Sequence, residues 1–287
     1  MKTSVSSYSF HQYVGQGKMA VIDCVAKAKE MGFDAIEFTD MPGANLQEQK
    51  DYAMKVRAEA DRLNMVINAY TIGACLYQDT QEAQDAEVER LKGQVDVAKI
   101  LGAKVMRHDV CYKLGKTGSS RSFDLMLPTI AANARKVTEY AASQGIVTCS
   151  ENHGFIAQDS DRVERLFNAV NHDNYGLLVD VGNFLCVGED PVMAVSRVAP
   201  YAVHAHVKDF VRKDSPSERF FRTRNGDYIC GTVVGEGIVP VKKCLSILMA
   251  AGYDGYVSVE FEGKEDCLTA IARGYRNLKQ MIAELEA

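Results

Sequence analysis

Four residues of the kind that bind metals each stand at the end of a short, apolar, strand-like run. The runs are IVTCS before Glu151, YGLLV before Asp180, VHA before His206 and YVSV before Glu260. If these runs are successive strands of one parallel barrel, the four side chains meet at its carboxyl-terminal mouth, where such barrels keep their active sites. Three carboxylates and one imidazole would form a site for a single divalent cation.

The elements that must position these residues follow from a module that recurs along the chain. A helical stretch ends at a glycine, and an apolar run follows within a few residues. The copies are AKAKEMGFDAIEF (26–38), VAKILGAKVMRH (97–108), YAASQGIVTCSE (140–151) and ILMAAGYDGYVSVE (247–260). Glycine just past a helix supplies a left-handed C-cap, and the apolar run is typical of a buried parallel strand. Alternating helices and strands indicate the α/β class.

The whole chain is predicted to be one (β/α)8 TIM barrel, residues 1–287. The expected strands are 3–9, 35–38, 66–70, 104–107, 146–150, 176–180, 203–207 and 256–260. The expected helices are 19–31, 46–63, 81–101, 122–144, 160–171, 191–199, 240–251 and 266–285. An open doubly wound sheet is the competing architecture, but the turn after the first strand lacks GxGxxG. The charged, glycine-containing segment 209–238 is expected to be a long loop insertion after strand seven that acts as a lid.

Composition favours an ordinary globular protein. Of the 287 residues 47% are hydrophobic and 25% charged, and the formal net charge is −5. The acidic balance disfavours nucleic acid as a partner, and no apolar run is long enough to span a membrane. The amino terminus shows no export signal, so a cytoplasmic protein is expected. The eight cysteines show no CxxC spacing and are expected to be buried free thiols.

Five motifs carry a family resemblance. SENHG (150–154), LVDVGNF (178–184), HAHVKDF (204–210), GEG (235–237) and VSVEFEG (257–263) resemble the xylose isomerase-like barrels, the sugar (phosphate) isomerases and epimerases related to tagatose 3-epimerase. The resemblance covers essentially the whole chain. It implies that Glu151, Asp180, His206 and Glu260 are metal ligands, and that the metal is Mn²⁺, Co²⁺, Mg²⁺ or Zn²⁺.

A ligand set dominated by oxygen, with open positions, favours a hard six-coordinate ion, and Mn²⁺ is the expected cofactor. Such an ion would act as a Lewis acid on a sugar carbonyl and stabilise the enediolate that forms when the adjacent carbon loses a proton. By resemblance to epimerases, Glu151 and Glu260 would be the base and the acid. His153, on the loop after strand five, is a further catalytic candidate because imidazole titrates near neutral pH.

Other residues are predicted to bind substrate or to support the site. On strand four, alternation allows only one of Arg107 and His108 to point inward, where it could bind a hydroxyl or a phosphate. Asn183 is expected to bind the substrate or a ligand carboxylate. Arg212 lies on the insertion and could bind a phosphate or an acid group, although a solvated position is the simpler interpretation. Glu236 is expected to contact the metal-binding side chains, without binding the metal itself, and so to orient them.

Strand seven carries two further candidates. Lys208 alternates with His206 and is expected either to pair with a neighbouring carboxylate or to face the substrate. His204 would sit one layer deeper, as a hydrogen-bonded core histidine.

Three other functions remain open on sequence alone. The first is a lyase subunit that cleaves 3-oxo-C-glycosides with the same metal and a histidine base, beside a small partner subunit. The second is a DNA repair enzyme like endonuclease IV, which is disfavoured because position 183 is Asn rather than a second histidine and because the chain is acidic. The third is a metal-free binding barrel. The favoured partner is a small sugar or sugar-derived substrate, and a homo-oligomer is expected. The sequence does not name the sugar.

Overall fold

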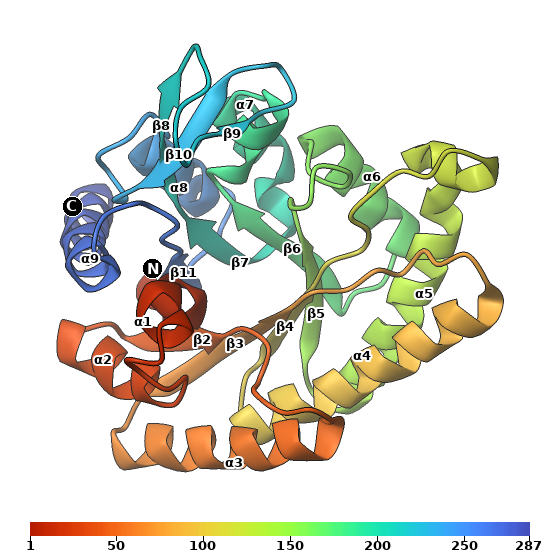
Figure 1. The fold of residues 1–287 in the computed structure, drawn as a ribbon, viewed down its shortest axis with the longest axis horizontal. Helices are drawn as coiled ribbons and strands as arrows, with labels where there is room; N and C mark the ends of the chain where they lie inside the picture. The colour runs from red at the N-terminus through yellow and green to blue at the C-terminus, as the bar shows by residue number, and fades with distance from the viewer.

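Eight parallel strands close into a barrel, as predicted. The computed structural model describes all 287 residues, and the strand order around the barrel is β1-β11-β7-β6-β5-β4-β3-β2. Figure 1 shows these strands at the centre of the molecule. The barrel strands are β1 (Lys2–Ser6), β2 (Ala35–Phe38), β3 (Val66–Ile72), β4 (Val105–His108), β5 (Val147–Glu151), β6 (Tyr175–Asp180), β7 (Ala202–Val207) and β11 (Tyr256–Val259).

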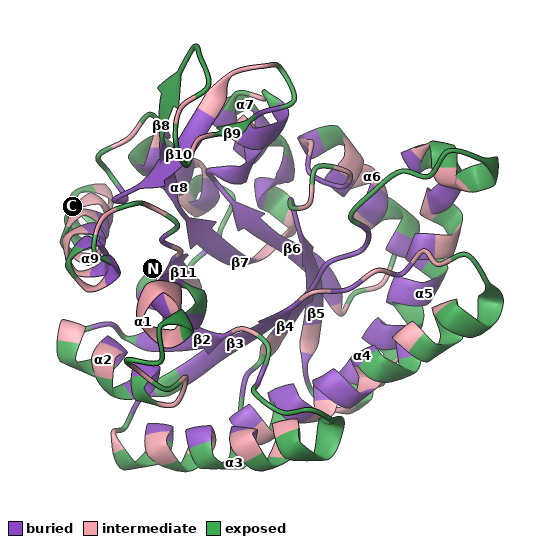
Figure 2. Cartoon of the chain, in the orientation of Figure 1, coloured by how far each residue is buried: buried purple, intermediate pink, exposed green.

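A ring of helices covers the barrel, one after each strand. They are α2 (Asp23–Met31), α3 (Leu46–Arg62), α4 (Gln81–Leu101), α5 (Phe123–Ser143), α6 (Ser160–Val170), α7 (Pro191–Val198), α8 (Val241–Ala250) and α9 (Cys267–Glu286), with a short α1 (His11–Gly15) near the amino terminus. Figure 2 shows their exposed faces turned outward and the strands buried. None of these helices combines the length and the apolarity needed to cross a bilayer.

The helix–glycine–strand module has the predicted geometry. Gly32, Gly102, Gly145 and Gly252 all have positive φ, between 72° and 92°. This left-handed conformation ends each helix. It is unfavourable for residues that have a Cβ atom, so glycine is favoured at these positions. The chain is thereby turned directly into the next strand. The two ends of the chain also lie close together, with the amino group of Met1 2.6 Å from the carboxylate of Glu286 on α9.

The first strand is shorter than the predicted span 3–9. It ends at Ser6, and residues Ser7–Phe10 form a 3₁₀ helix. The reason is local hydrogen bonding. The Ser6 hydroxyl accepts from the Tyr8 amide, and the Ser9 hydroxyl donates to the Val259 carbonyl and accepts from the Phe261 amide. Serine hydroxyls thus draw the backbone out of the strand and place the ring of Tyr8 at the mouth of the barrel.

The segment 209–238 is not the irregular loop that was predicted. It contains a three-stranded antiparallel sheet of β8 (Asp209–Lys213), β10 (Tyr228–Thr232) and β9 (Phe221–Arg222), at the upper edge of Figure 1. The sequence signal that was missed is the Asn225–Gly226 pair between two short apolar runs, which is typical of a hairpin. Because no residue of 209–238 lines the cavity at the barrel mouth, the lid role stays a prediction.

Candidate functional site

The four predicted ligand residues lie together at the carboxyl-terminal mouth of the barrel. One ligand atom from each of Glu151, Asp180, His206 and Glu260 lies within 4.8 Å of the others. The Nδ1 atom of His206 is 3.6 Å from Glu260 Oε2, 3.8 Å from Glu151 Oε1 and 3.9 Å from Asp180 Oδ2. The sequence argument about strand ends is therefore right about the positions, and metal binding by these residues stays a prediction.

The donor set fits a divalent cation. His206 Nδ1 is buried and makes no hydrogen bond, which is costly unless a partner satisfies it. The buried Asp180 Oδ2 faces it and lies 3.2 Å from Lys208 Nζ. Burial, together with the neighbouring carboxylates of Glu151 and Glu260, raises the pKa of Asp180 to about 6 even though Lys208 opposes the shift. A cation held by these oxygens and this nitrogen would satisfy the nitrogen and neutralise the crowded carboxylates.

Backbone and amide groups hold the ligands Asp180 and Glu151 in place. The second oxygen of Asp180, Oδ1, accepts from the amides of Gly182 and Asn183 at 2.8 and 2.9 Å. Asn152 pairs with the backbone of Asp180 through both ends of its amide. The side chain of Asn183 donates to Glu151 Oε1 at 2.9 Å, so it binds a ligand carboxylate, one of the two roles expected for it.

A series of contacts between ionisable side chains connects Glu151 to His153. The guanidinium of Arg107 contacts Glu151 Oε2 and lies 3.1 Å from Asp109 Oδ1. Asp109 Oδ1 is in turn 3.0 Å from Nδ1 of His153. This contact leaves Nε2 as the free ring nitrogen of a histidine that lines the cavity. Burial lowers the pKa of His153, but the hydrogen bond and the charge of Asp109 outweigh it and hold the pKa above its ordinary value.

Lys208 lies among carboxylates. Its Nζ is 2.5 Å from Glu260 Oε2, 3.2 Å from Asp180 Oδ2 and 3.7 Å from Glu262 Oε1. Burial raises the pKa of the Glu260 carboxyl, but the charges of Lys208 and His206 outweigh it and hold the pKa well below its usual range. Of the two roles expected for Lys208, the ion pair with neighbouring carboxylates is the one that the structure shows, and the side chain also lines the cavity.

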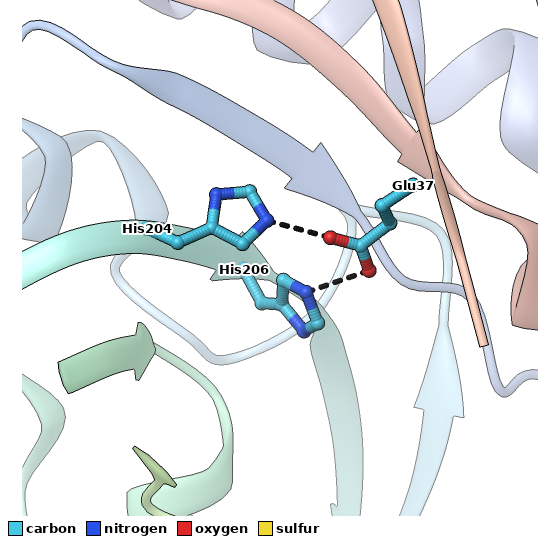
Figure 3. A group of neighbouring side chains, drawn as sticks. All are labelled: Glu37, His204 and His206. Atoms are coloured by element: carbon cyan, nitrogen blue, oxygen red, sulfur yellow. Dashed lines mark hydrogen bonds and ion pairs between the residues drawn. The ribbon is translucent and has the colours of Figure 1, made fainter. Parts of the chain in front are cut away.

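A carboxylate that the sequence analysis did not select, Glu37 on β2, supports the histidine ligand. Its Oε1 lies 2.7 Å from Nε2 of His206, and its Oε2 lies 2.6 Å from Nε2 of His204. Figure 3 shows this arrangement, with the two imidazoles of β7 directed at the two oxygens of one carboxylate. His204 is therefore the deeper, hydrogen-bonded core histidine that was predicted.

A cavity of about 290 Å³ opens above the ligand cluster, and only one of the twelve residues that line it is hydrophobic. Its walls include Arg107, His153, Lys208 and three of the predicted ligands. The lining residues that sequence reasoning missed are Tyr8, Thr39, Asp40, Thr71, Gly73 and Glu262. Such a wall offers hydroxyl and carboxylate partners for a small molecule rich in hydroxyl groups.

Three predicted residues do not line the cavity, so substrate binding by His108 and Arg212 and support of the ligands by Glu236 find no basis in this structure, whereas the solvated position also expected for Arg212 is observed. His108 is fully buried, points away from the cavity and has its Nδ1 2.9 Å from its neighbour's carbonyl, because strand alternation gives Arg107 the inward position. Arg212 leaves the barrel on β8 and lies 3.6 Å from Asp227. Glu236 contacts Arg273 on α9 and does not reach the ligands.

Two of the missed residues carry signals that the same reasoning could have used. Glu37 is the one charged residue inside the otherwise apolar run AIEF of β2, next to its last residue, and a buried strand carboxylate needs a partner. Glu262 is two residues beyond Glu260 and falls on the same side of an extended chain. By contrast, Asp109 directly follows the last residue of β4, in an irregular segment where a carboxylate has many uses, so no pattern identified it.

The chain belongs to the family described as Xylose isomerase-like TIM barrel, whose profile matches residues 25–285. The rhizopine catabolism protein MocC of Rhizobium meliloti is 31% identical over 220 residues, which are 69% of this chain and 65% of that protein. An inosose dehydratase of Lacticaseibacillus casei is 26% identical over 140 residues, which are 46% of each chain. The match thus spans about half the length of the inosose dehydratase.

Solved structures share the fold over nearly the whole chain. The IOLI protein, in a crystal structure with a bound zinc atom, has a TM-score of 0.77 at 18% identity and covers 99% of each chain. An L-ribulose 3-epimerase has a TM-score of 0.76 at 14% identity and covers 99% of this chain and 95% of that one. These likenesses establish the barrel, and the resemblance to this family predicted from the motifs is confirmed.

Proposed function

We propose that this chain is a divalent-metal-dependent enzyme that removes a proton from the carbon next to the carbonyl of a neutral polyhydroxy ketone, as a sugar isomerase or epimerase does. The observation that carries the proposal is the group of Glu151, Asp180, His206 and Glu260 under a polar cavity, with the buried Nδ1 atom of His206 facing the three carboxylates and lacking a hydrogen bond. The zinc in the related IOLI barrel supports a metal in this position. Mn²⁺ is the ion we expect, because most of the donors are oxygen.

The residues of the site have different roles in the proposed reaction. A divalent ion bound by the four ligands would polarise the carbonyl and stabilise the negative charge that follows proton loss. Glu151 and Glu260 are held by Arg107 and Lys208, so their carboxylates keep one orientation toward the cavity. We assign them the transfer of the proton from and to the substrate carbon.

The charges around the cavity favour a neutral substrate. Arg107 and Lys208 are its two cationic side chains, and each already contacts carboxylates, so neither is free to bind a phosphate. The remaining walls add the acidic residues Asp40 and Glu262. The inosose dehydratases and MocC are named for inosose and for rhizopine, and we extend such polyols to this chain as its substrate class.

A matched pair of substrates tests this charge argument. A free ketose or inosose should be turned over with kcat/KM at least about 100-fold above that of its phosphate ester, because about 3 kcal/mol of repulsion is expected between the phosphate and the cavity carboxylates of Asp40 and Glu262. Steady-state kinetics on both members of the pair measures the ratio. Equal or better use of the phosphate ester would contradict the neutral substrate.

Proton exchange tests the chemistry. Mn²⁺-loaded protein in D₂O with a panel of ketoses and inososes should exchange one carbon-bound hydrogen next to the carbonyl, seen by NMR and abolished by EDTA. Glu151→Gln and Glu260→Gln, measured at saturating Mn²⁺, should each lower the exchange rate about 100-fold or more. Glu139→Gln changes an exposed residue on α5 and serves as the matched control. Exchange at the wild-type rate by either site variant with metal bound would contradict the assignment of proton transfer to these two carboxylates.

A second candidate is dehydration, favoured by the contact between His153 and Asp109. An imidazole whose Nδ1 is held by a carboxylate can present Nε2 to a leaving hydroxyl as a general acid. The related inosose dehydratases support this reading. The same incubation separates the two outcomes, since dehydration yields a conjugated enone that absorbs in the ultraviolet, whereas epimerisation yields only an isomer. Release of an aglycone from a 3-oxo-C-glycoside would instead select the lyase with a partner subunit.

A further inference from the structure

The carboxylate of Glu37 has contacts on both of its oxygens inside the barrel. Oε2 lies 2.6 Å from Nε2 of His204 and accepts a hydrogen bond from the Ser258 hydroxyl at 3.0 Å. Oε1 lies 2.7 Å from Nε2 of His206. These residues belong to β2, β7 and β11, and β2 is not a hydrogen-bonded neighbour of either other strand. The Glu37 side chain therefore reaches across the interior of the barrel, as Figure 3 shows.

A packing role does not explain this residue. Glu37 is fully buried, and burying a carboxylate costs several kcal/mol that its partners must offset. The interiors of such barrels are usually filled with branched apolar side chains, which carry no such cost. A charged cluster at this depth thus needs a reason beyond filling space.

The position of His206 supplies that reason. At 2.7 Å a proton must lie between Nε2 and the carboxylate oxygen, because two lone pairs would repel each other. A neutral imidazole then has its other nitrogen, Nδ1, free as an acceptor. Nδ1 is the atom that faces Glu151, Asp180 and Glu260, and its distances of 3.6 to 3.9 Å from their oxygens are too long for hydrogen bonds.

We propose that Glu37 is a positioning residue that fixes His206 in the tautomer and orientation in which Nδ1 binds the metal. The inference rests on the metal centre of the proposed function and goes beyond it by assigning a role to a residue outside the ligand set. His204 and Ser258 have an indirect role. They bind the second oxygen of Glu37 and so stop its carboxylate from rotating away from His206.

The test is metal affinity in Glu37→Gln, which keeps the shape of the side chain and removes the charge. The amide can no longer accept from both histidines, so His206 loses its fixed tautomer. Titration calorimetry with Mn²⁺ should show affinity falling about 10- to 100-fold, as expected for loss of a carboxylate behind a histidine ligand. Ser258→Ala, which removes one hydrogen bond to Glu37 but leaves the contact with His206, should change affinity by no more than about threefold. Glu189→Gln, a half-buried glutamate that bonds Ser160, controls for the substitution itself.

The outcomes are distinct. If the wild-type chain binds no Mn²⁺ at one-to-one stoichiometry, the proposed metal centre fails, and the inference fails with it. If the wild type binds and Glu37→Gln binds equally well, even with a lower melting temperature, Glu37 is structural and the inference alone is overturned. If Glu37→Gln does not fold, ¹⁵N NMR of histidine in the Zn²⁺-loaded wild type decides. A protonated Nε2 on His206 is expected, and a protonated Nδ1 overturns the proposal.

Discussion

Asp180→Asn should abolish stoichiometric Mn²⁺ binding and lower proton exchange by about 1,000-fold or more, to the rate seen with EDTA. A metal that stabilises developing charge is worth several kcal/mol, which corresponds to a rate effect of this size. The loss follows from geometry. Asp180 Oδ2 is the oxygen that faces His206 and Lys208, and an amide NH₂ in its place would point hydrogens at the metal position.

The same variant should fold, because the backbone hydrogen bonds of Asp180 go to Oδ1 alone, and Lys208, which loses its contact with Oδ2, keeps Glu260 as an ion-pair partner. Oδ1 accepts from the amides of Gly182 and Asn183, and the carbonyl oxygen of asparagine can accept both bonds. Circular dichroism should therefore show an unchanged fold. Asp190→Asn is the matched control, since Asp190 only caps α7 and asparagine caps a helix about as well. Tight Mn²⁺ binding by Asp180→Asn would contradict the ligand set.

The barrel, and the meeting of the four candidate ligand residues at its mouth, could be predicted from the sequence because both depend on patterns that local chemistry imposes. The helix–glycine–strand module needs a left-handed residue at one place, and Gly32 and Gly102 have that conformation. Parallel strands bring their carboxyl ends to one edge, so residues such as Glu151 and Glu260, 109 positions apart, could be placed together from strand ends alone.

The errors arise where position depends on the path of a loop. Glu236 and Arg212 follow β7, in a segment whose small sheet carries them away from the mouth. No periodicity fixes the direction in which such a sheet projects. Asp109 is the opposite case, a residue just past the end of β4 that becomes part of the site only because Arg107 and His153 both reach it. Contacts between side chains from different loops are set by tertiary structure, which a single sequence does not display.

Lys208 carries the second large prediction, because its ammonium group contacts two of the predicted ligand carboxylates. Its side chain is only 4% exposed and contacts Asp180 and Glu260. Removing one partner of a buried ion pair leaves an uncompensated charge, at a cost of about 3–5 kcal/mol. Lys208→Met keeps the length of the side chain, so the metal-free variant should lose about that much free energy of unfolding, measured by urea denaturation with EDTA.

Metal should reverse this loss. A divalent cation at the ligand cluster would supply the positive charge that the variant lacks, and it would no longer be repelled by an ammonium group nearby. Lys208→Met should therefore bind Mn²⁺ more tightly than the wild type and regain stability as Mn²⁺ is added. Lys136→Met removes an exposed ion pair with Asp85 and should cost less than about 1 kcal/mol. If metal-free Lys208→Met were as stable as the wild type, or if its Mn²⁺ affinity fell, Lys208 would not be the counter-charge of the ligand carboxylates.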